Sequence, residues 1–138
     1  MSEPAGERTV TDQSGKRILV VEEEAIIALI EDDTLTEAGC AVVGPARTFE
    51  EARRLIATEQ IDAAVVDGTI GGVPAYELAD ALRRRNIPFV VATAGTLYRP
   101  RGIPVHEFRD ADFLDKPFTA QQLIDAVAAL LDRRTAAS

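Results

Sequence analysis

Short apolar runs alternate with helix-like stretches along most of the chain, and this alternation restricts the possible folds more than any other feature. Five runs have the length and composition of buried strands, at residues 18–21, 41–43, 61–66, 89–92 and 113–114. Four stretches have the pattern of helices, at residues 25–38, 48–59, 74–85 and 119–131. Because strands that alternate with helices form right-handed βαβ crossovers, the sequence predicts a parallel sheet covered by helices on both faces.

Several of the expected helices carry local signals. The sequences Thr48-Phe49-Glu50-Glu51 and Thr119-Ala120-Gln121-Gln122 are capping boxes, in which a hydroxyl and an acid or amide bond free backbone N–H groups. The first helix-like stretch has apolar residues at helical spacing: Ile26, Ile27, Ile30 and Leu35.

Three parts of the chain lack this regularity. Residues 1–15 are polar and aperiodic, so we expect a flexible leader before one folded domain at 16–134 and a short tail at 135–138. Residues 68–72 are rich in glycine and predict a loop. Residues 95–112 contain Pro100, Gly102 and Pro104, so any fourth helix there is short or missing. We expect this last segment to be the most mobile part of the domain and to report events at its functional site.

Composition excludes several classes of protein. A chain of 138 residues with 46% hydrophobic content can form one domain with a real core. Its 15 basic and 23 acidic residues give a net charge of −8, which argues against direct binding of nucleic acid. The single cysteine, Cys40, allows neither an internal disulfide nor a zinc site, and we expect it to be buried in a reducing compartment. With neither a signal peptide nor an apolar run long enough to enter a membrane, the sequence predicts a cytoplasmic protein.

Polar residues follow the apolar runs at the points where a parallel sheet would gather them. Glu22 and Glu23 follow the first run, Asp67 follows the third, Thr93 follows the fourth and Lys116 lies just past the fifth. Ligands bind in the crevice beyond the carboxyl ends of the strands in an open parallel sheet. Acids for a hard cation, a carboxylate nucleophile and a lysine for transferred charge together indicate a metal-assisted phosphoryl acceptor.

With these residues in this order, residues 16–132 resemble the receiver domain of two-component response regulators. The resemblance implies a flavodoxin-like, doubly wound α/β fold with five parallel strands in the order 2-1-3-4-5. Matched position by position, the functional residues of the family fall here on the acidic pair Glu22 and Glu23, the phosphoacceptor Asp67, the metal-binding backbone carbonyl of Thr69, the hydroxyl of Thr93, the switch aromatic Phe113, Lys116 and the cis proline Pro117.

The sequence Pro88-Phe89-Val90-Val91-Ala92-Thr93-Ala94-Gly95 also resembles a bacterial subgroup of single-domain receivers, the FAT-GUY type, named for a Phe-Ala-Thr-Gly motif after the fourth strand. The match is partial, since Val91 replaces the phenylalanine and Ala94 replaces the first glycine. A weak or missing fourth helix is typical of this subgroup.

The resemblance implies a signalling domain and not an enzyme. A sensor histidine kinase or a histidine phosphotransfer protein would donate a phosphoryl group to Asp67 in a Mg²⁺-dependent step. Because only six residues follow Leu131-Asp132, the output is expected to be a protein–protein contact made by a monomer or weak homodimer in a bacterial phosphorelay.

One departure from the family keeps a second interpretation open. The second acid is usually aspartate, the direct metal ligand, and here it is Glu23, whose extra methylene is poorly suited to the octahedral geometry of Mg²⁺. The alternative is therefore a pseudo-receiver that binds partners without phosphorylation. A phosphohydrolase with an aspartate nucleophile is disfavoured, because such enzymes generally need a second acid where this chain has Thr69.

Overall fold

The computed structural model describes residues 13–93, 108 and 111–137. The expected leader therefore lies almost entirely outside the described residues. Most of the segment 95–112, expected to be mobile and to have a short or missing fourth helix, lies outside them too.

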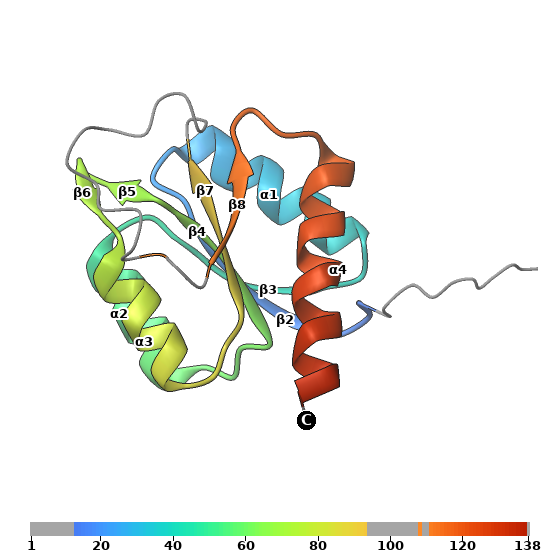
Figure 1. Cartoon of the computed structure of the whole chain (residues 1–138). Helices are drawn as coiled ribbons and strands as arrows, with labels where there is room; N and C mark the ends of the chain where they lie inside the picture. Colours follow the sequence, from blue (N-terminus) through green and yellow to red (C-terminus); the bar gives the residue numbers. More distant parts are fainter. Residues whose placement is uncertain (1–12, 94–107, 109–110, 138) are drawn as a thin grey trace, which may run out of the picture.

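Five parallel strands form one sheet at the centre of the molecule (Figure 1). They are β2 (Arg17–Val21), β3 (Ala41–Ala46), β4 (Ala63–Asp67), β7 (Phe89–Thr93) and β8 (Asp112–Asp115). Their spatial order is β3-β2-β4-β7-β8, which confirms the predicted order 2-1-3-4-5. The predicted end of the second strand was wrong: β3 continues through Gly44 and Pro45 to Ala46, with an irregular register against β2.

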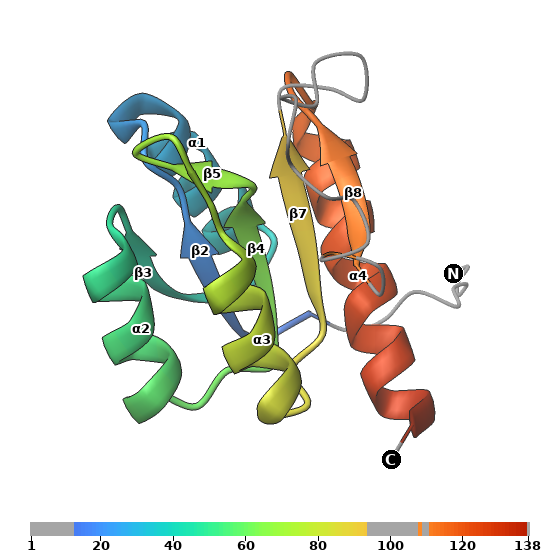
Figure 2. The same cartoon turned by 60° about the vertical axis from the view of Figure 1, so that its left-hand side comes forward.

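The described helices cover both faces of the sheet (Figure 2). The helices α1 (Ala25–Glu37) and α4 (Ala120–Ala137) lie on one face, while α2 (Phe49–Thr58) and α3 (Tyr76–Arg84) lie on the other. Alternate side chains of each strand enter opposite cores. Leu19 packs with the α2 and α3 side, and Ile18 packs with the α1 and α4 side. A sheet buried on both faces explains why its strands read as continuous apolar runs.

Both threonines cap their helices as predicted, but only the box at Thr119 is reciprocal, because the Glu51 side chain accepts from the Arg47 N–H at 2.9 Å. The Thr48 hydroxyl accepts a hydrogen bond from the Glu51 backbone N–H at 3.1 Å. At the start of α4 the Thr119 hydroxyl accepts from the Gln122 N–H at 3.0 Å, and the Gln122 side chain accepts from the Thr119 N–H at 2.8 Å. These bonds satisfy N–H groups that a helix leaves free in its first turn.

Helix α1 turns much of its apolar surface outward. Ile26, Leu29 and Ile30 are 74%, 59% and 55% exposed, although isoleucines 26 and 30 have the spacing of a core face. The side chains that α1 buries are Ala28, Glu31 and Leu35. Both sets recur every three to four residues, so spacing alone does not decide which face of this helix packs on the sheet.

The predicted loop at 68–72 is replaced by a small hairpin. Strands β5 (Thr69–Ile70) and β6 (Val73–Pro74) pair antiparallel, and Gly71 and Gly72 form the turn with φ of 59° and 78°. A two-residue turn with both φ values positive matches the twist of a hairpin and favours glycine at both positions.

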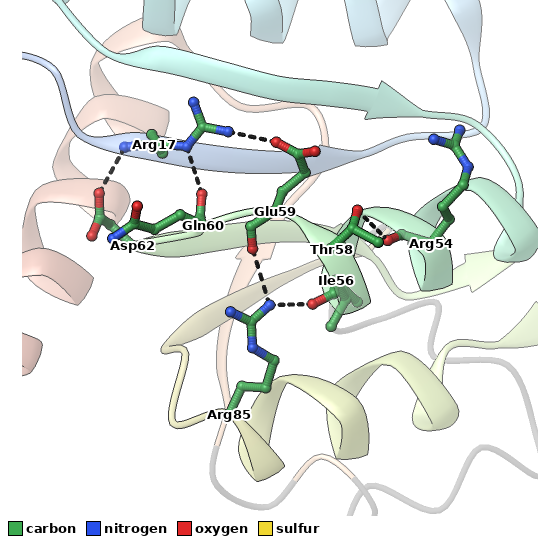
Figure 3. Close-up of polar contacts among 8 residues, drawn as sticks. All are labelled: Arg17, Arg54, Ile56, Thr58, Glu59, Gln60, Asp62 and Arg85. Atoms are coloured by element: carbon green, nitrogen blue, oxygen red, sulfur yellow. Dashed lines mark hydrogen bonds and ion pairs between the residues drawn. The ribbon is translucent and has the colours of Figure 1, made fainter.

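The amino ends of the strands carry a network of paired polar groups (Figure 3). Arg17 bonds the Glu59 carboxylate at 2.8 Å and the Gln60 carbonyl at 2.7 Å, and its backbone N–H bonds the Asp62 carboxylate at 2.8 Å. Arg85 donates to the carbonyls of Ile56 and Glu59, which lie at the end of α2. These contacts join β2 and the end of α3 to the end of α2 and the segment before β4.

Candidate functional site

The carboxyl ends of four neighbouring strands bring together side chains that lie far apart in the sequence. Glu22 directly follows β2, Asp67 ends β4, Thr93 ends β7 and Lys116 directly follows β8. Backbone bonds fix two of these positions: the Glu22 N–H donates to the Ala46 carbonyl at 2.9 Å, and the Lys116 N–H donates to the Thr93 carbonyl at 2.6 Å. The Lys116–Pro117 peptide bond is cis.

Lys116 joins the two buried acids. Its Nζ lies 2.9 Å from Glu22 Oε1 and 3.4 Å from Asp67 Oδ1. Glu22 is completely buried, and Asp67 is 8% exposed. Among the described side chains, one ammonium thus faces two carboxylates at the end of the central strand, so this group of three carries excess negative charge.

Burial and charge alter proton affinity in this group. Burial raises the pKa of Asp67 to about 6; the Lys116 charge opposes that rise and the Glu22 charge adds to it. Burial also acts to lower the pKa of Lys116, but its contacts with Glu22 and Asp67 outweigh burial and raise it. At neutral pH a charged lysine therefore faces a largely ionised Asp67, and neutralising more negative charge at this point would be favourable.

Thr93 and Phe113 lie along the same edge of the sheet. A Cβ placed on Gly68 would come within 3.2 Å of Thr93 Cγ2, so the Thr93 side chain lies beside the residue that follows Asp67. Phe113 is half-buried and meets Phe108 edge to face, with ring centroids 6.1 Å apart. Phe108 in turn packs against Tyr76 of α3, with ring centroids 4.7 Å apart. Phe113 is therefore linked through aromatic contacts to the helix behind Asp67.

Glu23 lies apart from the buried acids. Its side chain is exposed, and Oε1 accepts a hydrogen bond of 3.0 Å from the Gly71 N–H at the tip of the β5–β6 hairpin. Among the described residues, no three His, Cys, Asp or Glu side chains form a cluster able to enclose a metal ion. The structure thus brings Glu22, Asp67 and Lys116 together, and leaves Glu23 at the rim.

The residues nevertheless fit Mg²⁺, which does not need to be fully enclosed by protein ligands. Magnesium usually keeps several waters and takes only one or two carboxylates from a protein. Asp67 supplies a carboxylate. Thr69 pairs with Pro74 next to the hydrogen-bonded pair Gly68 and Ala75, and because bonded and non-bonded pairs alternate, the Thr69 carbonyl points away from β6. Glu22 Oε1 is a buried oxygen that lies 2.9 Å from the Lys116 ammonium. This donor set consists of oxygens, as a hard cation requires.

Sequence analysis missed one residue beneath this site. Glu31 on α1 is 1% exposed, and neither of its carboxyl oxygens has a hydrogen-bond partner within the described part of the chain. Burial and then the charge of Glu22 raise the pKa of Glu31 to about 8. Its spacing from Ala28 and Leu35 is that of one helix face, but the exposed apolar residues of α1 have the same spacing, so this signal alone did not place Glu31 inside.

Comparison with known proteins identifies a matching family and several similar structures. The model of the response regulator receiver domain matches residues 18–128. A response regulator receiver protein from Sinorhizobium medicae superimposes with a TM-score of 0.70 at 32% identity, over 87% of this chain and 97% of that one. The response regulator TrrA from Thermotoga maritima, solved in complex with Mg²⁺-BeF, superimposes with a TM-score of 0.71 at 27% identity, over 84% of this chain and 99% of that one.

Curated relatives are longer than this chain. The transcriptional regulatory protein PdtaR of Mycobacterium tuberculosis is 30% identical over 86% of this chain and 58% of its own length. The uncharacterized transcriptional regulatory protein YrkP of Bacillus subtilis is 30% identical over 86% of this chain and 51% of its own length. The chain thus spans about half the length of the curated relatives it matches. Within the described residues, no helix is both long and apolar enough to cross a membrane.

Proposed function

Because the chain belongs to the response regulator receiver family of two-component systems, we propose that Asp67 accepts a phosphoryl group from a phosphohistidine on a partner protein. Receiver domains are signalling domains rather than classical enzymes. The observation that carries the proposal is the position of Asp67, at the end of the central strand with Lys116 Nζ 3.4 Å from its carboxylate. We further propose a cytoplasmic domain that signals through protein–protein contacts.

In the proposed transfer, an Asp67 oxygen attacks phosphorus while the bond between phosphorus and the donor histidine breaks. The electron pair of that bond stays with the imidazole nitrogen, and Asp67 becomes an acyl phosphate. Lys116 is already charged and in place, so it can follow the developing negative charge onto a phosphoryl oxygen. Its present pairing with Glu22, at 2.9 Å, keeps the ammonium at the site before transfer.

Four groups would hold the cation in this step: Asp67, the Thr69 carbonyl, Glu23, and Glu22 through a water molecule. Bound Mg²⁺ supplies positive charge that draws the phosphoryl oxygens together with the attacking carboxylate.

The neighbours of Asp67 support a route from phosphorylation to the surface. Thr93 lies beside Gly68 with its Cγ2 towards that glycine, and we propose that a small movement brings its hydroxyl to a phosphoryl oxygen. Such a movement changes the space beside Phe113, whose ring already packs against Phe108. We propose that Thr93 and Phe113 move together and that the surface near β7 and β8 reports the change.

The exposed face of α1 favours a protein as phosphodonor. Asp67 is recessed, so a donor histidine must be presented by a surface that lies across the rim of the site. Ile26, Leu29 and Ile30 form one apolar stripe on the helix that begins just after the acidic loop. An apolar contact next to the acceptor would hold the donor in position during transfer.

Acetyl phosphate, a small phosphodonor, tests the acceptor without a partner protein. With Mg²⁺ present, the intact mass of the wild type should increase by one phosphoryl group, and that of Asp67→Asn should not change. Omission of Mg²⁺ should reduce labelling of the wild type. A folded wild type that never gains mass would favour the pseudo-receiver, an alternative supported by the engagement of Glu23 with Gly71.

Ile26→Asp separates donor docking from acceptor chemistry. This variant should be labelled normally by acetyl phosphate, but should accept phosphoryl groups from a cognate histidine phosphotransfer protein about tenfold more slowly. Val73→Asp, an exposed apolar position on the hairpin, is the matched control. Equal transfer rates in Ile26→Asp and the wild type would exclude the α1 stripe as the docking surface.

A further inference from the structure

The Glu23 side chain connects two loops at the rim of the site. Its carboxylate accepts the Gly71 N–H at 3.0 Å, although the two residues are 48 positions apart. Glu23 belongs to the loop between β2 and α1, and Gly71 is at the tip of the β5–β6 hairpin, which lies beside that loop in Figure 2. The bond therefore joins the acidic loop to the segment that contains Thr69.

The backbone on the Glu23 side of this bond is held independently. Arg47 Nε donates to the Glu23 carbonyl at 3.1 Å, and the preceding residue, Glu22, donates its N–H to Ala46 at 2.9 Å. The Glu23 side chain is exposed, so it can change rotamer without moving buried groups. Any displacement of its carboxylate thus leaves the loop backbone in place.

The hairpin has a fixed base and an exposed tip. At the base, the Gly68 N–H bonds the Ala92 carbonyl at 2.8 Å, and the Ala75 N–H bonds the Gly68 carbonyl at 2.9 Å. Gly71, Gly72 and Val73 at the tip are exposed. A contact at Gly71 therefore acts on the part of the hairpin that has most freedom to move.

The Glu23 carboxylate cannot remain on Gly71 and also join the buried acids. In its present position it does not form a cluster with Glu22 and Asp67 that could hold a metal ion. The extra methylene of glutamate gives the reach to Gly71, and an aspartate at this position would be shorter by that methylene. A rotation of the side chain exchanges one position for the other.

We propose that Glu23 is a positioning residue with two alternative partners, the Gly71 N–H in the metal-free protein and a divalent cation when the site is loaded. Cation binding then releases the hairpin tip, and the hairpin contact opposes cation binding. The second half of this proposal rests on the proposed Mg²⁺ site, whereas the contact with Gly71 does not.

Two substitutions separate the partners. Glu23→Gln retains an oxygen at the same reach but loses the charge that attracts a cation, whereas Glu23→Asp retains the charge but loses the reach. The amide exchange rate of Gly71, measured by NMR on the full chain, reports the hairpin contact without any need for phosphorylation. In EDTA, exchange should be about threefold to tenfold faster in Glu23→Asp than in the wild type or Glu23→Gln.

Addition of MgCl₂ tests the exchange of partners. Gly71 exchange should accelerate in the wild type to the Glu23→Asp rate, with no change in Glu23→Gln, and Mg²⁺ should bind Glu23→Asp more tightly than the wild type. Equal Gly71 rates in all three proteins in EDTA would overturn the contact. Slow Gly71 exchange in wild type exposed to MgCl₂ would overturn the competition. The Gly71 exchange rates in EDTA do not depend on whether Asp67 accepts a phosphoryl group. The two proposals can therefore fail separately.

Discussion

The two ends of the same sheet differ in how completely their charged groups are paired. At the amino ends of the strands, Arg17 and Arg85 meet the carboxylates and carbonyls of the Glu59–Asp62 turn, and the described contacts pair these groups directly (Figure 3). At the carboxyl ends, Lys116 is the one described cation paired with Glu22 and Asp67, with Glu31 buried beneath them. One end is electrostatically balanced, and the other has excess negative charge.

The difference separates stability from function. Removing a donor from a paired network costs free energy of unfolding, because its acceptors lose their hydrogen bonds. Removing an acid from a crowded acidic site relieves desolvation and repulsion, and so should stabilise the fold. We therefore expect substitutions at the two ends to change stability with opposite signs.

The largest effect is expected at Glu31. Because its pKa is raised to about 8, its proton is bound in the folded protein and released on unfolding at neutral pH. The stability that this proton gives is complete below the ordinary glutamate pKa and is lost as pH rises through about 8. Glu31→Gln should consequently be about 3 to 4 kcal/mol more stable than the wild type at pH 8, and nearly equal to it at pH 4.5.

Urea denaturation at both pH values measures this difference. Glu37→Gln, at an exposed position on the same helix, is the control and should unfold like the wild type at each pH. An unchanged stability of Glu31→Gln at pH 8 would mean that Glu31 is ionised in the fold with its charge compensated.

A smaller stabilisation is expected from Asp67→Asn. The pKa of Asp67 is raised to about 6 chiefly by burial, so its charge costs stability above that pH. The variant should gain about 1 to 2 kcal/mol at pH 7.5 in metal-free buffer, even though it loses the phosphoacceptor. Asp115→Asn, at the exposed end of β8, should leave stability unchanged. Destabilisation by Asp67→Asn would place Asp67 in a balanced network like that of the opposite end.

The smallest effect, of opposite sign, is expected from Arg85→Ala. This substitution removes the donors to the Ile56 and Glu59 carbonyls at the end of α2, and should cost about 1 kcal/mol. Thermal unfolding of Arg85→Ala beside Arg84→Ala, at the adjacent and equally exposed position, provides the comparison. Equal midpoints for the two variants would show that the network at this end contributes little to stability.

Much of this architecture could be predicted from the sequence, because long-range order followed from strong local patterns. The apolar runs predicted the parallel sheet, and their ends placed Asp67 and Lys116 on one edge. Strands of two residues, as in the β5–β6 hairpin, are too short for periodicity to reveal. The buried side of α1 was also beyond prediction, because both of its stripes have helical spacing and only packing against the sheet places Glu31 inside.

The central claim is that Asp67 carries the phosphoryl group, and mapping of the modified residue tests it most directly. After reaction with acetyl phosphate and Mg²⁺, borohydride reduces an aspartyl phosphate to homoserine, which tandem mass spectrometry locates in the sequence. We predict homoserine at position 67 in the wild type, with aspartate retained at every other acidic position. Homoserine at another position, or none in a protein that has gained phosphate, would contradict the assignment of Asp67 as the acceptor.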